Sequence, residues 1–188
     1  MNLRETRLAT ETVYDGVLLR VQKDRVRLPD GGASVREWIA HPGASAIVPL
    51  LADGSTVLVR QFRYPPQREF LEVPAGKHDR PAGGDTVTAE EAEATARREL
   101  REETGLEAER WTHLGATYPG IGYSDERIEL YLAENLTQHA QAADADEFVE
   151  PVRLPFADAV TMARRGELLD AKTCVAVLMA HAHLAGRG

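Results

Sequence analysis

The chain has 188 residues, of which 43% are apolar and 28% charged, which is ordinary for a soluble globular protein with one sizeable α/β core. Its net charge of −8 argues against a general nucleic-acid binder, which would normally present a basic face. No apolar run approaches the length of a membrane span, and the polar start shows no secretory signal. We therefore expect a cytoplasmic protein that binds neither membrane nor nucleic acid.

Residues 12–40 alternate and turn like a small antiparallel β region. Residues 17–21, 25–28 and 34–39 are strand candidates, and residues 29–32 form a strong turn signal before the last of them. Pro42 and Gly43 then mark a boundary. We predict an N-terminal β region at residues 1–41 and a larger domain at residues 42–188.

The larger domain predicts an α/β fold. Residues 45–51 and 55–60 flank Asp53 and Gly54, a hairpin signal, and residues 127–133 alternate as a half-buried strand. Helices are predicted over residues 156–165 and from Asp170 onwards, with Asp170 as the N-cap. Strands, a central helix, more strands and final helices favour a mixed β-sheet packed between helices.

The central helix has clear start and stop signals. Thr88 with Glu91 three residues later forms a capping box, and Gly105 suits the position after the last turn. Near its end Glu99, Glu102 and Glu103 are spaced i, i+3 and i+4, so they share one face. Three like charges favour a bound cation, and Mg²⁺ takes such oxygen ligands together with substrate phosphates. The alternative is a solvated helix face with i,i+4 ion pairs.

The string from Gly84 to Leu106 resembles the Nudix box. It reads Gly84, five residues, Glu90, seven residues, Arg98-Glu99, an aliphatic residue, any residue, Glu102-Glu103, any residue and Gly105. The chain is thus similar to Nudix hydrolases, which cleave nucleoside diphosphates linked to another moiety. The resemblance implies a mixed sheet sandwiched between helices, with the box as a loop, a helix and a loop.

The resemblance also implies a metal site. Glu99, Glu103 and Glu102 would bind Mg²⁺, or Mn²⁺ in its place, with the backbone carbonyl of Ala75. Arg98 would orient the carboxylates through charge-assisted hydrogen bonds. Two metal ions would then activate a water molecule for in-line attack at one phosphorus.

One position departs from the family pattern. The box glycine usually follows a Pro-Ala dipeptide, which here is Pro74-Ala75, followed by Gly76, eight positions before Gly84. We interpret Gly76 as the structural equivalent and residues 77–87 as an enlarged loop. The role of Glu90 then stays open.

Outside the box the chain resembles the ADP-ribose pyrophosphatase branch. The segment from Glu72 to Lys77, the proline thirteen residues past Leu106, and residues 60–64 and 122–126 are similar to its pattern. That branch builds a homodimer through its N-terminal region, which also completes the base pocket. The implied substrate-binding residues are Arg63, Trp38, Glu72, Pro119 and Ser124.

Some of these residues have structural alternatives. Arg63 can clamp a diphosphate with its guanidinium fork, or can be a surface residue at a strand end. Trp38, Tyr64 and Phe62 are candidates for stacking on adenine, although aromatic residues in strands often belong to the core. The resemblance implies that the catalytic base comes from an acidic loop after the main strands. Glu147 is our choice over Asp144 and Asp146, and the alternative is a solvated acidic loop without a catalytic role.

The resemblance therefore implies Mg²⁺-dependent hydrolysis of ADP-ribose to AMP and ribose 5-phosphate, with Glu147, Glu102 and Arg98 as catalytic residues. Another nucleoside diphosphate sugar such as GDP-mannose is the alternative substrate. A Nudix-fold ligand sensor without hydrolysis is a different class of function. Its carboxylates could be lost without penalty, whereas all three are present here, and residues 1–40 look β-rich rather than like a DNA-binding segment.

Overall fold

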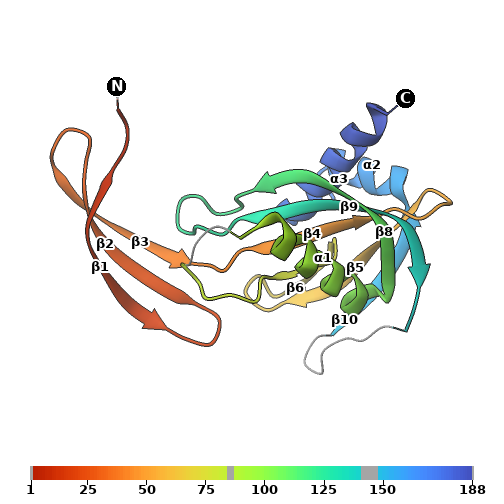
Figure 1. The fold of residues 1–188 in the computed structure, drawn as a ribbon, viewed down its shortest axis with the longest axis horizontal. Coiled ribbons are helices and arrows are strands. Elements are labelled where there is room, and N and C mark those ends of the chain that lie inside the picture. Colours follow the sequence, from red (N-terminus) through yellow and green to blue (C-terminus); the bar gives the residue numbers. More distant parts are fainter. Residues whose placement is uncertain (1, 84–86, 141–147, 188) are drawn as a thin grey trace.

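The computed structural model describes residues 2–83, 87–140 and 148–187. Within these ranges the strands form three sheets, and three helices accompany them. A small sheet at the N-terminus projects to one side of a larger body, which contains all of the helices (Figure 1).

The N-terminal sheet consists of β1 (Thr6–Asp15), β2 (Arg20–Arg27) and β3 (Ala33–Ala40), paired antiparallel in that order. The predicted antiparallel region is confirmed, with two differences. Residues 17–19 lie in the turn between β1 and β2, closed by the hydrogen bond from Gly16 N to Leu19 O at 2.9 Å, and β2 is a single strand. We did not predict β1 as a strand of this length, because all ten of its residues are exposed and its apolar residues do not alternate.

The body contains two further sheets. In one, β4 (Ala44–Pro49) pairs antiparallel with β7 (Ala75–Lys77) and parallel with β9 (Ile128–Gln138), which in turn pairs with β8 (Leu106–Thr117). In the other, β5 (Ser55–Arg63) lies between β6 (Arg68–Glu72) and β10 (Val149–Pro155). The mixed sheet and its α/β class are as predicted.

The hairpin predicted at Asp53 and Gly54 is present only as a tight reversal of the chain. Gly54 N donates to Leu51 O at 3.0 Å, Leu51 N donates to Ser55 O at 2.9 Å, and Leu50 forms an antiparallel bridge with Thr56, but β4 and β5 themselves belong to different sheets. Both edges of β4 are taken by β7 and β9, and both edges of β5 by β6 and β10. These long-range partners prevent the local ladder.

Helices cover both faces of the four-stranded sheet. Helix α1 (Ala89–Thr104) packs on one face, where Ala92, Ala96 and Leu100 meet Ile47 of β4. Helix α3 (Ala171–Ala185) packs on the other, where Ala176 and Val177 join a core with Ala46 and Val48, and α2 (Phe156–Arg164) packs against α3, β5 and β10. Because β4 is buried along its whole length, alternate side chains feed both cores. No helix in the described ranges is long and apolar enough to cross a membrane.

Both predicted caps of α1 are present. Thr88 Oγ1 accepts from Glu91 N at 3.2 Å, and Glu91 Oε2 accepts from Thr88 N at 2.9 Å. Gly105 ends the helix in the left-handed region at φ 70°, and its N–H donates to Arg101 O. Asp170 caps α3 as predicted, accepting from Thr173 N at 3.0 Å.

We predict that Thr88→Ala lowers the free energy of unfolding by about 1 kcal/mol, because Glu91 N then loses its acceptor in the first turn of α1. For a chain of this size that corresponds to a fall of about 2–4 °C in Tm. Urea denaturation followed by circular dichroism measures the change. Thr88→Ser keeps the hydroxyl and is the matched control; an equal loss for both variants would contradict the capping role.

Candidate active site

Strand β7 approaches α1 so closely at Gly76 that the Glu99 carboxylate occupies the space where a Cβ atom would lie. A Cβ atom added to Gly76 would lie 1.9 Å from the carboxyl carbon and from Oε1 of Glu99. The neighbouring Ala75 N donates to Glu103 Oε2 at 3.1 Å. This geometry supports Gly76 as the box glycine, whereas Gly84 lies outside the described residues. Glu90 is exposed in the first turn of α1, far from the end of the helix that carries these carboxylates.

The three predicted metal-binding carboxylates share this end of α1. The side chains of Glu99 and Glu103 are buried, with residue exposures of 6% and 4%, and Glu102 is half-buried. Nη1 of Arg98 lies 2.7 Å from Glu99 Oε1 and 2.8 Å from Glu102 Oε2. Partial burial opposes the charge of Arg98, but Glu99 and Glu102 outweigh it and raise the Arg98 pKa above its ordinary value. Arg98 thus contacts two of the three carboxylates that it was predicted to orient, Glu99 and Glu102.

These carboxylates are not gathered around one point. Among the described residues, no three His, Cys, Asp or Glu side chains form a ready-made metal site. The three carboxylates are held by different partners: Arg98 contacts Glu99 and Glu102, whereas Glu103 accepts from Ala75 N. The chemistry of the donor set still fits a hard divalent cation, since it consists of carboxylate oxygens. A divalent ion would share Glu99 and Glu102 with Arg98, since each carboxylate has a second oxygen.

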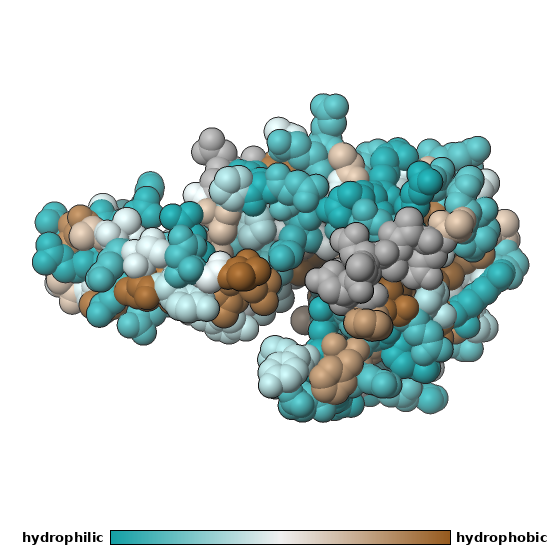
Figure 2. Space-filling model, turned by 90° about the horizontal axis from the view of Figure 1, so that it is seen from below, coloured by the Kyte–Doolittle hydropathy of each residue, from teal (hydrophilic) through white to brown (hydrophobic). Residues whose placement is uncertain are grey.

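A cleft of about 1180 Å³ opens beside the carboxylates. Glu99, Glu102 and Arg98 form one wall, and residues 75–82 border it. A second wall of the cleft is formed by Arg63, Glu72 and the start of α3, and residues 15–20 of the N-terminal turn also line the cleft. Figure 2 shows the molecule from below, and its surface is hollowed between the N-terminal sheet and the body. The volume exceeds that of most small-ligand pockets.

The enlarged loop after β7 is anchored by His78. This side chain is buried at 4% exposure, with its Nε2 3.0 Å from Ser45 Oγ and its backbone N–H donating to Gly43 O at 3.1 Å. Burial lowers the pKa of His78, so the ring is neutral near pH 7. The neutral anchor fixes the near end of residues 77–82 along the cleft.

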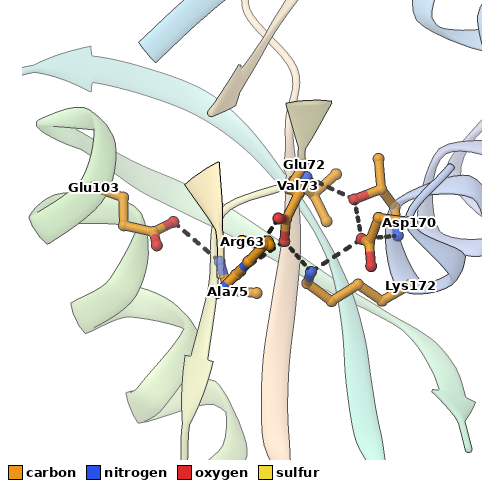
Figure 3. A network of polar contacts seen from close by, with 8 residues as sticks. Arg63, Glu72, Val73, Ala75, Glu103, Asp170 and Lys172 are labelled. Carbon is orange, nitrogen blue, oxygen red and sulfur yellow. Dashed lines mark hydrogen bonds and ion pairs between the residues drawn. The ribbon is translucent and has the colours of Figure 1, made fainter. Parts of the chain in front are cut away.

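Arg63 and Glu72 form a bidentate ion pair in the cleft wall (Figure 3). Arg63 Nε donates to Glu72 Oε1 at 2.6 Å and Nη2 donates to Oε2 at 2.7 Å, while Lys172 Nζ also donates to Oε2. Lys172 Nζ donates in addition to Asp170 Oδ2 at 2.9 Å. Burial opposes ionisation of Glu72, but the hydrogen bonds and charges of Arg63 and Lys172 outweigh it and hold the Glu72 pKa below its ordinary value.

The sequence did not reveal two residues of this wall. Lys172 lies in the first turn of α3. A positive charge is unfavourable there unless carboxylates pair with it, because the N-terminus of a helix is itself positive. This unfavourable position is the feature of the sequence that could have indicated a role for Lys172. Phe70 also lines the cleft, unlike Phe62 and Tyr64. It lies two residues before Glu72 on β6, so strand alternation places both on one face.

The other predicted substrate-binding residues are divided. Pro119 lines the cleft, as do Arg63 and Glu72. Trp38 and Ser124 do not: Trp38 Nε1 donates to Asp24 Oδ2 at 3.1 Å within the N-terminal sheet, and Ser124 Oγ donates to Ile39 O at 3.2 Å. The candidate bases Glu147, Asp144 and Asp146 lie outside the described residues.

Comparison with known proteins gives concordant matches. Residues 40–173 match the model of the NUDIX domain, and residues 5–39 match that of the nucleoside diphosphate sugar hydrolase N-terminal domain. The chain is 38% identical to an ADP-ribose pyrophosphatase from Bacillus subtilis, covering 94% of this chain and 92% of that protein. It is 37% identical to a methanol dehydrogenase activator from Bacillus methanolicus, with coverages of 92% and 90%.

Two more distant matches are also to hydrolases. A GDP-mannose pyrophosphatase from Yersinia enterocolitica is 29% identical, covering 83% of this chain and 84% of that protein. The crystal structure of an ADP compounds hydrolase superposes with a TM-score of 0.80 at 24% identity, covering 100% of this chain and 98% of the other, which shows the common fold. Since the domain model spans most of the chain and relatives above 30% identity cover nearly all of it, the chain belongs to the Nudix hydrolase family.

Proposed function

We propose that this Nudix hydrolase cleaves the diphosphate of a nucleoside diphosphate sugar, with ADP-ribose as its substrate and AMP and ribose 5-phosphate as products. The proposal is carried by the cleft, which has the carboxylate end of α1 on one wall and the Arg63 guanidinium on another. A diphosphate needs cationic groups along its length, and a guanidinium fork matches its oxygens. The Bacillus subtilis relative, named as an ADP-ribose pyrophosphatase, supports this choice of substrate.

Glu99, Glu103 and Glu102, with the carbonyl of Ala75, are the proposed ligands for Mg²⁺, or for Mn²⁺ in its place. A divalent ion held there would neutralise the diphosphate and lower the pKa of a water molecule. Arg98 orients Glu99 and Glu102 from the side of the cleft. Gly76 leaves the space that Glu99 occupies, and Ala75 N–H steadies Glu103.

The catalytic base remains our prediction from the sequence. Glu147 is the proposed residue, with Asp144 and Asp146 as alternatives in the same acidic segment. The base would take a proton from the attacking water, whose oxygen joins one phosphorus while the bridging oxygen leaves with the other phosphate.

We also propose a homodimer, with residues 1–41 as the dimerising region and residues 42–188 as the catalytic domain. Strand β1 is an edge strand and is exposed along its whole length. Leu8, Val13 and Tyr14 on it are 39%, 49% and 58% exposed, and an edge with apolar side chains favours association. Because Trp38 and Ser124 do not line the cleft of their own chain, they would serve a base pocket only across such a dimer.

A regulatory protein is the second candidate, and the relative named as a methanol dehydrogenase activator is the observation that favours it. We prefer hydrolysis because a ligand sensor has no need for three carboxylates on one helix end, two of them buried at a cost in desolvation.

We predict that Glu103→Gln lowers kcat about a hundredfold or more while the fold is retained. The amide oxygen can still accept from Ala75 N, but the side chain loses the charge that a divalent ion requires. Steady-state hydrolysis of ADP-ribose with and without Mg²⁺ measures the effect. Glu90→Gln, on the exposed first turn of the same helix, is the matched control and should leave kcat unchanged. Full Mg²⁺-dependent turnover by Glu103→Gln would contradict the metal assignment.

We predict that ADP-ribose gives the highest kcat/KM in a panel of nucleotide sugars that includes GDP-mannose. Chromatographic measurement of AMP or GMP release separates the substrates, with Glu103→Gln as the blank. Turnover of GDP-mannose at an equal or higher kcat/KM would reject ADP-ribose as the substrate and leave the phosphoanhydride chemistry in place.

We predict that the protein in solution has twice the chain mass of 20.7 kDa. Size-exclusion chromatography with light scattering measures the mass. A version that begins at residue 42 should elute as a monomer if the N-terminal region holds the dimer together. A full-length monomer at micromolar concentration would contradict the proposal.

A further inference from the structure

We infer that Lys172 is a positioning residue that keeps the buried Glu72 paired while Arg63 turns from Glu72 to the substrate diphosphate. The inference rests on the proposed function, because it takes Arg63 as the side chain that meets the diphosphate. Lys172 acts through Glu72 and Arg63 and does not itself touch the substrate.

The exposures of the three side chains show which of them can move. Glu72 is 3% exposed, Lys172 is 13% exposed and Arg63 is 44% exposed. Arg63 therefore has open space toward the cleft, whereas the Glu72 carboxylate cannot be rehydrated where it lies. A buried carboxylate that loses its only cation is strongly destabilised. Release of Arg63 would be prohibitive if Arg63 were the sole partner of Glu72.

Lys172 supplies the second partner from a different element. Its Nζ lies between Glu72 Oε2 and Asp170 Oδ2, so it is held whether or not Arg63 is present. Asp170 is held in turn as the N-cap of α3, accepting from Thr173 N at 3.0 Å and from Thr173 Oγ1 at 2.6 Å. Figure 3 shows Lys172 reaching Glu72 from α3, while Arg63 comes from the strand layer.

The start of α3 also fixes the backbone that leads to the carboxylates. Thr173 Oγ1 accepts from Val73 N at 2.9 Å, and two residues later Ala75 N donates to Glu103 Oε2 (Figure 3). The scaffold that holds Lys172 is therefore continuous with the wall that holds Glu103. Movement of Arg63 leaves this scaffold in place, because none of these bonds involves the guanidinium.

Lys172 is poorly placed to bind a phosphate directly. Its ammonium already donates to two carboxylates and is nearly buried. Arg63, by contrast, meets Glu72 with the same two-pronged geometry that a phosphate would offer. Exchange of one anion for the other at Arg63 thus costs little when Lys172 remains on Glu72.

The test is a double-mutant cycle on ADP-ribose hydrolysis with Lys172→Met, Arg63→Met and the double variant. We expect Lys172→Met to raise KM about tenfold to a hundredfold with a much smaller change in kcat, because Arg63 stays locked on Glu72. Lys172→Arg should restore KM, and Lys172→Met should raise it no further when Arg63 is already Met. Additive effects, or a fall in kcat at unchanged KM, would overturn the inference.

Arg165→Met is the control for loss of one positive charge, since Arg165 is exposed just after α2 and does not line the cleft. Thermal melting checks that each variant is folded at the assay temperature. If Lys172→Met is not, Lys172→Gln takes its place, because the amide still donates to Glu72 without the charge. A KM for Lys172→Gln equal to that of the unmutated protein would also overturn the inference.

Binding of inorganic pyrophosphate separates this inference from the proposed function. Isothermal titration without added divalent ions measures its affinity, and the NMR signal of the Arg63 Nε–H group reports the release from Glu72. We expect both responses in the unmutated protein and a tenfold or greater weakening in Lys172→Met. If they appear while ADP-ribose is not hydrolysed, only the proposed function fails. Equal pyrophosphate affinity in folded Lys172→Met would overturn the role of Lys172.

Discussion

The candidate site depends on the close approach of β7 to α1 at Gly76. Without a side chain at this position, the Glu99 carboxylate can lie where a Cβ atom would otherwise be, 1.9 Å away. The same approach brings Ala75 N–H to Glu103. Two buried carboxylates on adjacent turns repel each other, so their burial has to be compensated by Arg98, by the backbone and, in the proposed function, by a cation. The capping of α1 at Thr88 and Gly105 keeps the helix end at this place.

In the opposite wall of the cleft, the charge of a buried carboxylate is compensated by side chains alone. Glu72 is as deeply buried as Glu99, but two cations from different elements share it. One of them is exposed toward the cleft and the other is fixed at the start of α3. This division couples packing to function, because the helix that completes the core against β4 also supplies the charge that makes the cleft wall stable.

Local signals predicted the parts of the fold that local chemistry determines. The caps of α1 and α3 follow from Thr88, Gly105 and Asp170, whose bonds are made within four residues in the sequence. The turn at Asp53 does not continue into a ladder between β4 and β5, because these strands pair with segments up to a hundred residues away. Strand β1 could not be predicted at its full length, because all of its residues are exposed and its sequence shows no alternation of buried and exposed positions.

The same distinction applies to the site. The spacing of Glu99, Glu102 and Glu103 placed them on one helix face, and the Pro74-Ala75-Gly76 context located the glycine that Glu99 touches. Lys172 and Phe70 were missed because their importance comes from contacts with Glu72 and with the cleft that only the tertiary fold creates. Trp38 and Ser124 were identified from resemblance, yet within one chain they stabilise the junction between β2, β3 and the loop before β9.

Charge balance explains how an acidic protein can hold an anionic ligand. The described residues that line the cleft include six cationic and seven acidic side chains, so the cleft is nearly neutral while the chain carries −8. Arg63 and Arg98 are each held on carboxylates, Arg63 on Glu72 and Arg98 on Glu99 and Glu102. A divalent ion among the α1 carboxylates would invert the local field, and while Lys172 stays on Glu72 the Arg63 guanidinium can turn to the ligand. The cleft thus becomes more attractive to a diphosphate when both sets of carboxylates have another partner, so a bound divalent ion would strengthen the binding of the ligand.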